Sequence, residues 1–448
     1  MSLQFIEGGA GTGKTTTVIE RLGQLLVASP FCEHQRVLAL TKMHGSRRRV
    51  RERLLAVAGL NGRFESVTID SFAWRIVVRW RSLARVLNGA TMPTEYDAIC
   101  DLAGRLLEEP VVQKWVASSF PIVVVDELQD SKAGQLRVLM GLCMQCECIA
   151  AGDPFQDLEG DEACSSVDWA RAQCTPTVLE TTHRSSNAGL LAAAAAFRNG
   201  QPVTASGGFS FKGVAAAPLG AWEVASKIAK WRKLGTVAVI TPVGTRSPFV
   251  RQVVERVNSK PPLGKKWPVG PFNLPWEVAQ DEQVAQTYRD LGLPDDDEAR
   301  VRAEHLKLDG GGRISRVREW LSRQRRLFGR HEFSVAEVRA VVKEVVHQGR
   351  LYSRRDERRL VAITIHQAKN REFDRVIVLW PYEVSGNDER KRRLAYNAIT
   401  RARHEALVVV QGEARVGQSP FVPGVSSSPK AAKGQKRERK AKHPEKPV

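Results

Sequence analysis

A glycine-rich turn close to the N-terminus constrains the fold more than any other part of the chain. Residues 8–15 read Gly-Gly-Ala-Gly-Thr-Gly-Lys-Thr and match the pattern G-x-x-x-x-G-K-[ST]. The turn follows an apolar run, Leu3 to Ile6, and precedes a stretch with helical spacing, Thr15 to Leu26. Glycines let backbone N–H groups wrap a phosphate, and the helix N-terminus adds the positive end of its dipole. The pattern therefore predicts a strand, a phosphate-binding loop and a helix, with ATP as the ligand.

The loop and one acidic pair supply the groups that ATP hydrolysis needs. Lys14 is placed to neutralise the β- and γ-phosphate oxygens, and the Thr15 hydroxyl to ligate Mg²⁺. Asp126-Glu127 directly follows the apolar run 122–125, and Mg²⁺ is held by a carboxylate at such a strand end beside the loop. We therefore predict Asp126 as the second Mg²⁺ ligand and Glu127 as the base that orients or deprotonates the attacking water. The predicted ATP contacts are Gly8, Gly9, Ala10, Gly11, Thr12, Gly13, Lys14, Thr15 and Thr16.

Short apolar runs bounded by turn residues recur along the chain and alternate with helical stretches. Continuous runs of this kind suit central strands of parallel sheets that are covered on both faces. The alternation indicates an α/β fold, and two sets of runs separated by a long stretch indicate two parallel-sheet core domains. The runs are residues 37–40, 122–125 and 148–151 in the first half, and 237–240, 376–379 and 407–410 in the second.

The same pattern sets the expected domain boundaries. Residues 1–200 are predicted to form the first core, with a short helical insert at about 72–118, and residues 201–259 and 346–414 the second. Residues 260–345 are polar and helix-rich, which indicates an inserted helical subdomain. Residues 415–448 are rich in Lys, Arg, Ser, Pro and Gly with almost no apolar residues, so we predict a disordered basic tail.

The composition favours a polyanionic partner. The formal net charge is +19, and residues 430–448, with eight Lys or Arg and two Glu, supply +6 of it. The remaining +13 makes the body of the chain basic as well, which favours nucleic acid. No apolar run approaches the roughly 18 residues of a membrane span, and the N-terminus lacks signal-peptide features. We therefore expect a cytoplasmic protein without a membrane partner.

Three cysteines lie close together, and they leave two interpretations open. Cys143, Cys146 and Cys148 are separated by two residues and by one, which permits a zinc or iron–sulfur site but does not give the paired spacing of such sites. Cys148 also begins the apolar run that continues to Ala151, which indicates a buried strand.

An ordered series of motifs follows the phosphate loop and gives the chain its resemblance to a known family. The motifs are a DExQD-like box at 126–130, a GDxxQ-like box at 152–156, His183-Arg184-Ser185-Ser186, a TxHxAK…EF-like box at 364–373, Arg393-Leu394-Ala395-Tyr396 with its continuation to 402, and the shorter segments 40–41 and 68–72. In this order they resemble the UvrD/Rep-like superfamily 1 helicases. The resemblance implies two RecA-like cores that form an ATP cleft.

The resemblance also implies roles for individual residues. Gln156 would sense the γ-phosphate, Arg184 and Arg401 would contact it, and Glu372 would contact the nucleotide. The implied substrate is single-stranded DNA or a partial duplex, with movement in the 3′→5′ direction. Residues expected to contact nucleic acid are Thr41, His44, Ser71, Phe72, Trp74 and His366, with Trp380 as a further candidate.

Several positions depart from the family's pattern and keep a second function open. Asp157-Leu158-Glu159 stands where an aromatic base-stacking residue is usual, and Asn370 where the family has Gly. The family's adenine-reading Gln, upstream of the loop, has no counterpart in the seven residues before Gly8. The alternative is a DNA-stimulated ATPase that acts as a sensor or regulatory subunit beside a nuclease in a repair or defence complex, with little unwinding of its own. The basic run 46–51 either tracks phosphates or forms a solvated helix face.

Overall fold

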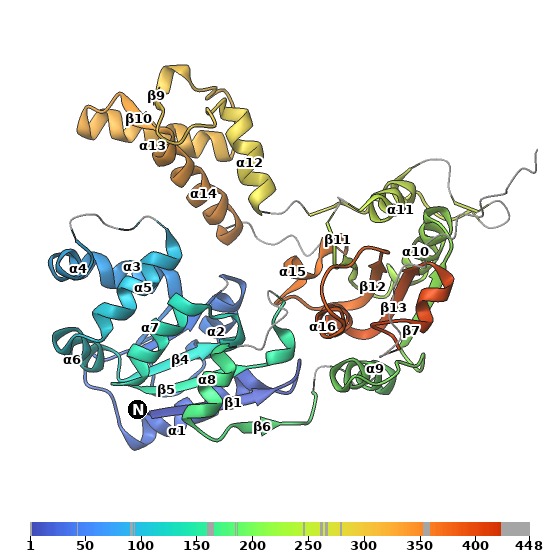
Figure 1. The fold of residues 1–448 in the computed structure, drawn as a ribbon, viewed down its shortest axis with the longest axis horizontal. Coiled ribbons are helices and arrows are strands. Elements are labelled where there is room, and N and C mark those ends of the chain that lie inside the picture. The colour runs from blue at the N-terminus through green and yellow to red at the C-terminus, as the bar shows by residue number, and fades with distance from the viewer. Residues whose placement is uncertain are drawn as a thin grey trace, which may run out of the picture.

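The chain folds around two separate parallel β-sheets, which lie side by side, and a small helical subdomain (Figure 1). The computed structural model describes residues 2–42, 44–89, 93, 95–158, 165–183, 185, 187–244, 247–259, 263–264, 268–277, 280–352 and 359–422. None of the helices within these ranges combines the length and the apolar content of a bilayer-crossing segment.

The first core is a six-stranded sheet with the strand order β3-β2-β4-β5-β1-β6, and every neighbouring pair is parallel. Its strands are β1 (Ser2–Gly8), β2 (Val37–Thr41), β3 (Phe64–Thr68), β4 (Ile122–Asp126), β5 (Glu147–Gly152) and β6 (Thr177–Leu179). Its helices are α1 (Lys14–Ala28), α2 (His44–Leu55), α3 (Ile69–Arg79), α4 (Arg81–Asn88), α5 (Tyr96–Leu107), α6 (Pro110–Ser119), α7 (Ala133–Cys143) and α8 (Ser165–Gln173), with short 3₁₀ turns at Leu128–Asp130 and Pro154–Gln156.

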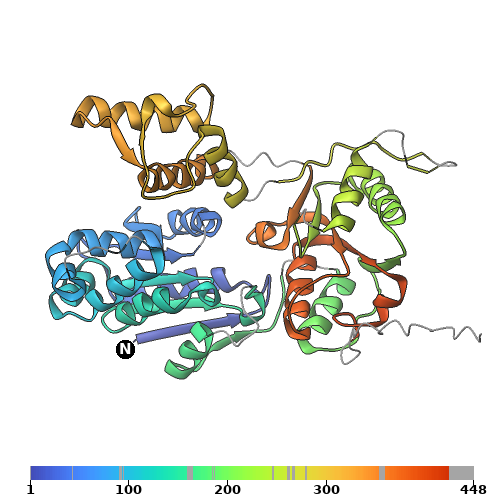
Figure 2. The ribbon, with the colours of Figure 1, turned by 45° about the horizontal axis from the view of Figure 1, so that its top comes forward.

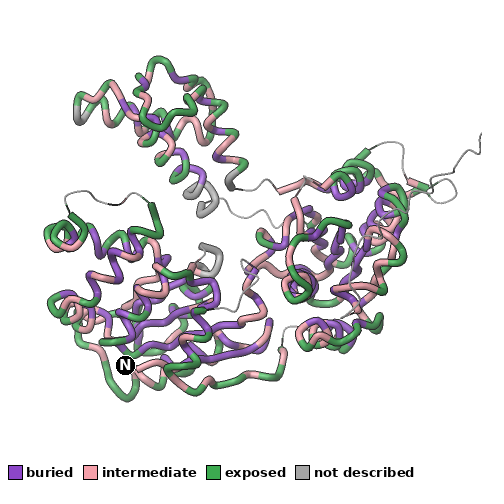
Figure 3. The backbone as a smooth tube through the Cα atoms, in the orientation of Figure 1, coloured by how far each residue is buried: buried purple, intermediate pink, exposed green. Residues whose placement is uncertain are grey.

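Both faces of this sheet are covered, as the continuous apolar runs predicted. One hydrophobic cluster packs α3 to α7 on one face, and a second packs α1 and α2 on the other. In Figure 3 the central strands of both cores are accordingly drawn as mostly buried. Cys143, Cys146 and Cys148 belong to the first cluster, and burial raises the pKa of the Cys146 thiol to about 12.

The second core is a five-stranded parallel sheet with the strand order β11-β8-β12-β13-β7. Its strands are β7 (Phe209–Val214), β8 (Val237–Thr241), β11 (Leu360–Thr364), β12 (Phe373–Trp380) and β13 (Ala402–Gln411). Its helices are α9 (Ala188–Asn199), α10 (Ala217–Trp231), α11 (Pro248–Asn258), α15 (Ile365–Ala368) and α16 (Asp388–Ile399). The two-core α/β architecture predicted from the sequence is confirmed.

The predicted start of the tail at residue 415 is wrong for its first eight residues. A 3₁₀ turn at Glu413–Gly417 leads to Phe421, whose side chain is buried against Phe197 and Trp380. The backbone N–H of Val203 donates to Phe421 O at 2.9 Å. Residues 413–422 therefore form a C-terminal strap on the second core. The rest of the predicted tail lies outside the described residues.

The inserted subdomain has its own hydrophobic cluster and begins later than the predicted residue 260. It consists of α12 (Gln280–Leu291), β9 (Arg300–Arg302), a 3₁₀ turn at Ala303–His305, α13 (Arg313–Phe328), β10 (Glu332–Ser334) and α14 (Val335–Tyr352). Phe272 and Leu274 instead pack into the second core. In both ribbon views the subdomain lies over the first core, although its chain leaves and re-enters the second (Figures 1 and 2).

The carboxyl ends of the first sheet point towards the second core, as the strand arrows show (Figures 1 and 2). In parallel α/β sheets, ligands bind at this edge. The phosphate loop after β1, the acidic pair after β4 and the turn after β5 are thus brought together opposite α15 and α16.

Candidate active site

The phosphate loop has the predicted strand–loop–helix geometry. Gly11 and Gly13 adopt φ values of 78° and 88°, in the left-handed region that glycine enters without a Cβ clash. Lys14 Nζ donates to Gly8 O at 2.9 Å and to Gly9 O at 3.0 Å. These bonds hold the ammonium group against the loop. Thr15, the predicted Mg²⁺ ligand, follows in the first turn of α1.

The acidic pair closes β4 at the floor of the cleft. Glu127 has φ 59° and ψ 51°, a left-handed conformation that is rare for a residue with a side chain and typical of functional turns. Gln129 Nε2 donates to Glu127 Oε2 at 2.6 Å. This hydrogen bond therefore restrains the Glu127 carboxylate.

The two carboxylates have opposite pKa shifts. Burial and the neighbouring charge of Glu127 raise the pKa of Asp126 to about 7, although Lys14, Arg49 and Arg53 oppose this shift. For Glu127, burial alone would raise the pKa, but Lys14 and Lys369, the Gln129 hydrogen bond and Arg401 together lower it. Glu127 is therefore ionised at neutral pH, as a base must be.

The donor set fits a magnesium ion that also coordinates phosphate. Within the described residues, no group of three or more His, Cys, Asp and Glu is arranged to hold a metal by itself. Mg²⁺ in nucleotide sites commonly takes one or two protein oxygens, with the rest from phosphates and water. Thr15 and Asp126 offer such oxygens. The pKa of Asp126 is raised by burial and by the adjacent charge of Glu127, and a bound divalent cation would offset both effects.

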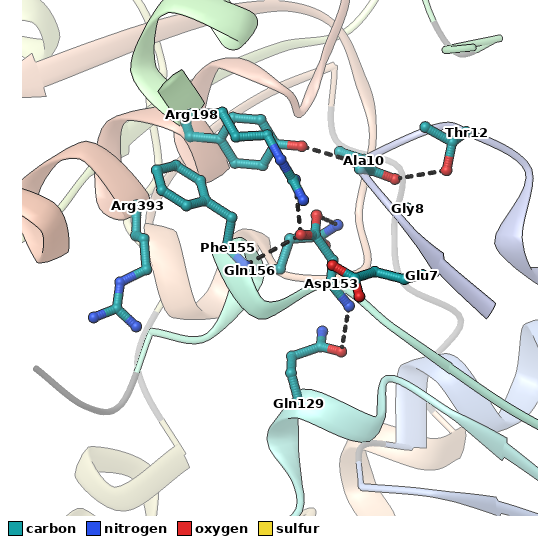
Figure 4. Close-up of polar contacts among 12 residues, drawn as sticks. Glu7, Gly8, Ala10, Thr12, Gln129, Asp153, Phe155, Gln156, Arg198 and Arg393 are labelled. Carbon is teal, nitrogen blue, oxygen red and sulfur yellow. Dashed lines mark hydrogen bonds and ion pairs between the residues drawn. The ribbon is translucent and has the colours of Figure 1, made fainter. Parts of the chain in front are cut away.

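The turn after β5 connects the acidic pair to the predicted γ-phosphate sensor. The Asp153 N–H donates to Gln129 Oε1 at 3.0 Å, and Gln156 Nε2 donates to Asp153 Oδ2 at 2.8 Å. A continuous chain of hydrogen bonds thus runs from Glu127 through Gln129 and Asp153 to Gln156, and Figure 4 shows its part from Gln129 to Gln156.

The opposite wall of the cleft comes from the second core. Tyr396 Oη accepts a hydrogen bond from the Ala10 N–H of the phosphate loop at 2.8 Å. Lys369 forms an ion pair with Asp130 and donates to Gln156 O at 3.4 Å. Arg401 is 3% exposed, and its charge acts on Glu127. Segments more than two hundred residues apart therefore meet at one site.

The structure does not test the predicted nucleotide contacts of Arg184 and Glu372. Arg184 lies outside the described residues, although the N–H of its neighbour His183 donates to Gly11 O at 2.8 Å. Glu372 forms an ion pair with Arg403, with N–O distances of 3.2 Å.

The basic helix α2 contributes cations to this site that the sequence did not assign to it. Arg53 donates to Thr16 Oγ1 at 3.1 Å, and Arg49 donates to Asn370 O in the second core. Both arginines lower the pKa of Asp126. Two other residues that join the cores here, Arg198 on α9 and Tyr396, were also not among the predicted site residues. Of these two, only Tyr396 lies in one of the family-like motifs. The α2 arginines could have been found in the sequence, because they form a basic helix directly after the carboxyl end of a strand.

The predicted nucleic-acid contacts divide into accessible and enclosed side chains. Ser71, Trp74 and His366 are exposed. Thr41 is 0% exposed, Phe72 is 1% exposed and packs on Phe120 with ring centroids 6.1 Å apart, and Trp380 is buried against Phe421. The predictions for Thr41, Phe72 and Trp380 are therefore wrong in this structure, because these side chains offer no surface to a DNA strand. The side chain of His44 lies outside the described residues.

Comparisons with known proteins agree with this geometry. A family model described as an AAA domain matches residues 1–160, which carry the phosphate loop, the acidic pair and the sensor turn. A model described as the UvrD-like helicase C-terminal domain matches residues 359–409, which carry Lys369, Tyr396 and Arg401. No curated protein matches the chain. The two matched segments form the two walls of the cleft. The two matches together support a UvrD/Rep-like superfamily 1 helicase with ATP-dependent helicase or translocase activity.

Proposed function

We propose that the chain is a translocase on single-stranded DNA that moves 3′→5′ and unwinds duplex where it meets it. The observation that carries the proposal is the shared cleft, in which Ala10, Glu127 and Asp130 of the first core lie against Tyr396, Arg401 and Lys369 of the second. A nucleotide held by both walls would draw them together, and its hydrolysis would let them part. Alternating closure of two cores is a means of moving along a strand.

In this proposal each group at the cleft has one task in hydrolysis. Lys14 neutralises the β- and γ-phosphates, Glu127 takes the proton of the attacking water, and Gln156 orients that water against the γ-phosphate. Arg184 and Arg401 stabilise the negative charge that develops. Thr15 and Asp126 would hold Mg²⁺, which supplies further charge neutralisation on the phosphates when bound.

The DNA strand is proposed to cross the same side of both cores. Ser71 and Trp74 on α3 and His366 on α15 are exposed there. Trp74 also lines a mainly apolar cavity of about 360 Å³ with Arg75, Val78, Arg79 and Trp115. An aromatic ring stabilises a stacked base by about 1–3 kcal/mol without reading its sequence, so this side suits a strand of any sequence.

ATPase and unwinding assays test the proposal together. Single-stranded DNA should stimulate ATP hydrolysis strongly, RNA less, and Lys14→Ala should abolish the activity. Partial duplexes with a 3′ or a 5′ single-stranded tail distinguish direction, and only the 3′-tailed substrate should be unwound. ATPase activity that is the same with and without DNA would rule out a motor. Stimulated ATPase without unwinding of either substrate would instead support the regulatory ATPase beside a nuclease.

A further inference from the structure

One arginine that belongs to none of the family-like motifs lies where the two cores meet. Arg198 is on α9, in the second core, and its Nη1 donates to Asp153 Oδ1 of the first core at 2.8 Å. It also lies close to the Tyr396 hydroxyl, whose pKa it lowers, and its guanidinium lies 5.8 Å from the centre of the Phe155 ring. Figure 4 shows this side chain between the phosphate loop and the sensor turn.

The carboxylate that Arg198 contacts holds the γ-phosphate sensor in place. Asp153 is 0% exposed, its Oδ1 also accepts the Phe155 N–H at 3.1 Å, and its Oδ2 accepts Gln156 Nε2 at 2.8 Å. An enclosed carboxylate without a cation costs several kcal/mol. Among the described residues, the ion pairs of Asp153 come from Arg198 alone. The conformation of the turn that presents Gln156 therefore depends on this arginine.

The other partner of Arg198 reaches the phosphate loop. Burial, with the nearby charge of Asp153, raises the pKa of Tyr396 to about 12, so its hydroxyl remains neutral and accepts the Ala10 N–H. The fit is close: a Cβ added at Gly9 would lie 3.1 Å from Tyr396 Oη and 3.6 Å from Arg198 Nη1. A fork-shaped guanidinium can serve both acceptors at once.

We infer that Arg198 is a positioning residue for ATP hydrolysis, which fixes Gln156 through Asp153 and the Ala10 amide through Tyr396. Because the arginine belongs to the second core and both targets to the first, the sensor is correctly placed only when the cores are correctly seated. Arg198 thus makes hydrolysis depend on core position. This inference rests on the proposed role of Gln156 in hydrolysis.

Substitution of Arg198 tests this role, because a positioning residue should change kcat much more than KM for ATP. Arg198→Met keeps an unbranched side chain but loses the charge and the hydrogen bond to Asp153. We expect the DNA-stimulated kcat to fall about 10- to 100-fold, the range for residues that orient catalytic groups, with KM for ATP changed less than threefold. Arg198→Lys, which keeps a cation for Asp153 but not the fork, should recover part of the loss.

Arg375 provides a matched control in the same core. Its Nε donates to Glu405 at 2.9 Å and its Nη1 to Leu234 O at 3.1 Å, so Arg375→Met also removes an ion pair and a second hydrogen bond. This variant should lower the Tm without changing kcat more than twofold. An Arg198→Met variant with normal kcat, or one whose loss of kcat is matched by Arg375→Met, overturns the inference.

A double substitution separates the inference from general destabilisation and from the wider proposal. Tyr396→Phe retains the ring but loses the acceptor for Ala10. The loss in Arg198→Met with Tyr396→Phe should be smaller than the product of the two single losses, because both act through one contact. Independent, multiplicative losses would contradict the shared role. If Lys14→Ala is inactive while all the Arg198 variants are normal, the motor survives and only this inference fails.

Discussion

At the residue scale, the ionised carboxylate of Asp126 is needed for function but lowers the stability of the folded protein. The pKa of Asp126 is raised to about 7 by burial and by the adjacent Glu127, whereas an Asp in an unfolded chain titrates near pH 4. Between these values the folded protein binds more protons than the unfolded chain. Stability therefore falls as the pH rises from about 4 to 7. Active sites commonly carry such a cost because the same charge is needed for function.

We therefore expect Asp126→Asn to abolish Mg²⁺-dependent ATP hydrolysis and yet stabilise the fold. In the absence of Mg²⁺ at pH 8, the free energy of unfolding should rise by roughly 1–3 kcal/mol, since each pKa unit corresponds to about 1.4 kcal/mol. The gain should shrink at pH 5 and vanish only near pH 3, where Asp126 is protonated in both states. Urea unfolding at the three pH values measures this. A gain that does not depend on pH would contradict the explanation.

The residues that could be predicted from sequence are those whose chemistry is tied to a fixed spacing. Lys14 follows from the glycine pattern and Asp126 from the end of an apolar strand. Phe72 was assigned wrongly because its environment depends on the inward face of α3, where Ile69, Phe72, Ala73, Ile76 and Val77 are buried at helical spacing. Arg198 gave no signal at all, because its partners are distant in sequence and meet it only in the folded protein.

At the scale of elements, helix α2 illustrates how a charge run is interpreted only after folding. Its arginines suggested phosphate tracking or a solvated face, but Arg49 and Arg53 point to the cleft, where they contact Asn370 and Thr16. The strands, by contrast, were predictable, because a sheet covered on both faces demands continuous apolar runs. Their order within each sheet was not, since it depends on pairings between distant segments.

The position of Arg53 predicts a function in hydrolysis and not in DNA binding. Arg53→Ala removes the hydrogen bond to Thr16 and a charge that acts on Asp126. A charge-assisted hydrogen bond stabilises by about 1.5–3 kcal/mol, so kcat/KM for ATP should fall about tenfold or more, with DNA affinity unchanged. Arg51→Ala, on the same exposed helix, is the control and should behave as wild type. Weaker DNA binding with normal ATP kinetics in Arg53→Ala would restore the phosphate-tracking interpretation.

The C-terminal strap gives a prediction about the boundary of the fold. Phe421 is buried among Phe197, Phe211 and Trp380, and replacing a buried Phe by Ala costs about 3–5 kcal/mol. Phe421→Ala should therefore lower the free energy of unfolding by about that amount, measured by denaturant titration. A chain ending at Val422 should be as stable as the full chain, and one ending at Gly412 should be much less stable. The sequence did not reveal the strap because its few apolar residues, among them Val416 and Phe421, stand among polar ones.

At the scale of the whole molecule, the distribution of charge predicts that both the cores and the C-terminal residues contribute to DNA binding. The full chain has a net charge of +19, and residues 423–448, with eight Lys or Arg and two Glu, account for +6, which leaves 19 − 6 = +13. Each phosphate that a protein neutralises steepens the fall of log affinity with log salt by about 0.9 for duplex and 0.7 for single-stranded DNA. We therefore expect the charge of residues 423–448 to add affinity for DNA.

Removal of residues 423–448 should therefore weaken DNA binding without slowing the motor. The truncated protein should bind single-stranded DNA more weakly at low salt, with a salt dependence shallower by several units on the logarithmic slope. Its kcat at saturating DNA should equal that of the full chain, because Lys14, Glu127, Arg198 and Arg401 are all retained. Fluorescence anisotropy over a salt series and ATPase titrations with DNA measure the two quantities separately. An unchanged slope would mean that the tail does not touch DNA, whereas a lower kcat at saturation would mean that it acts on the cores themselves.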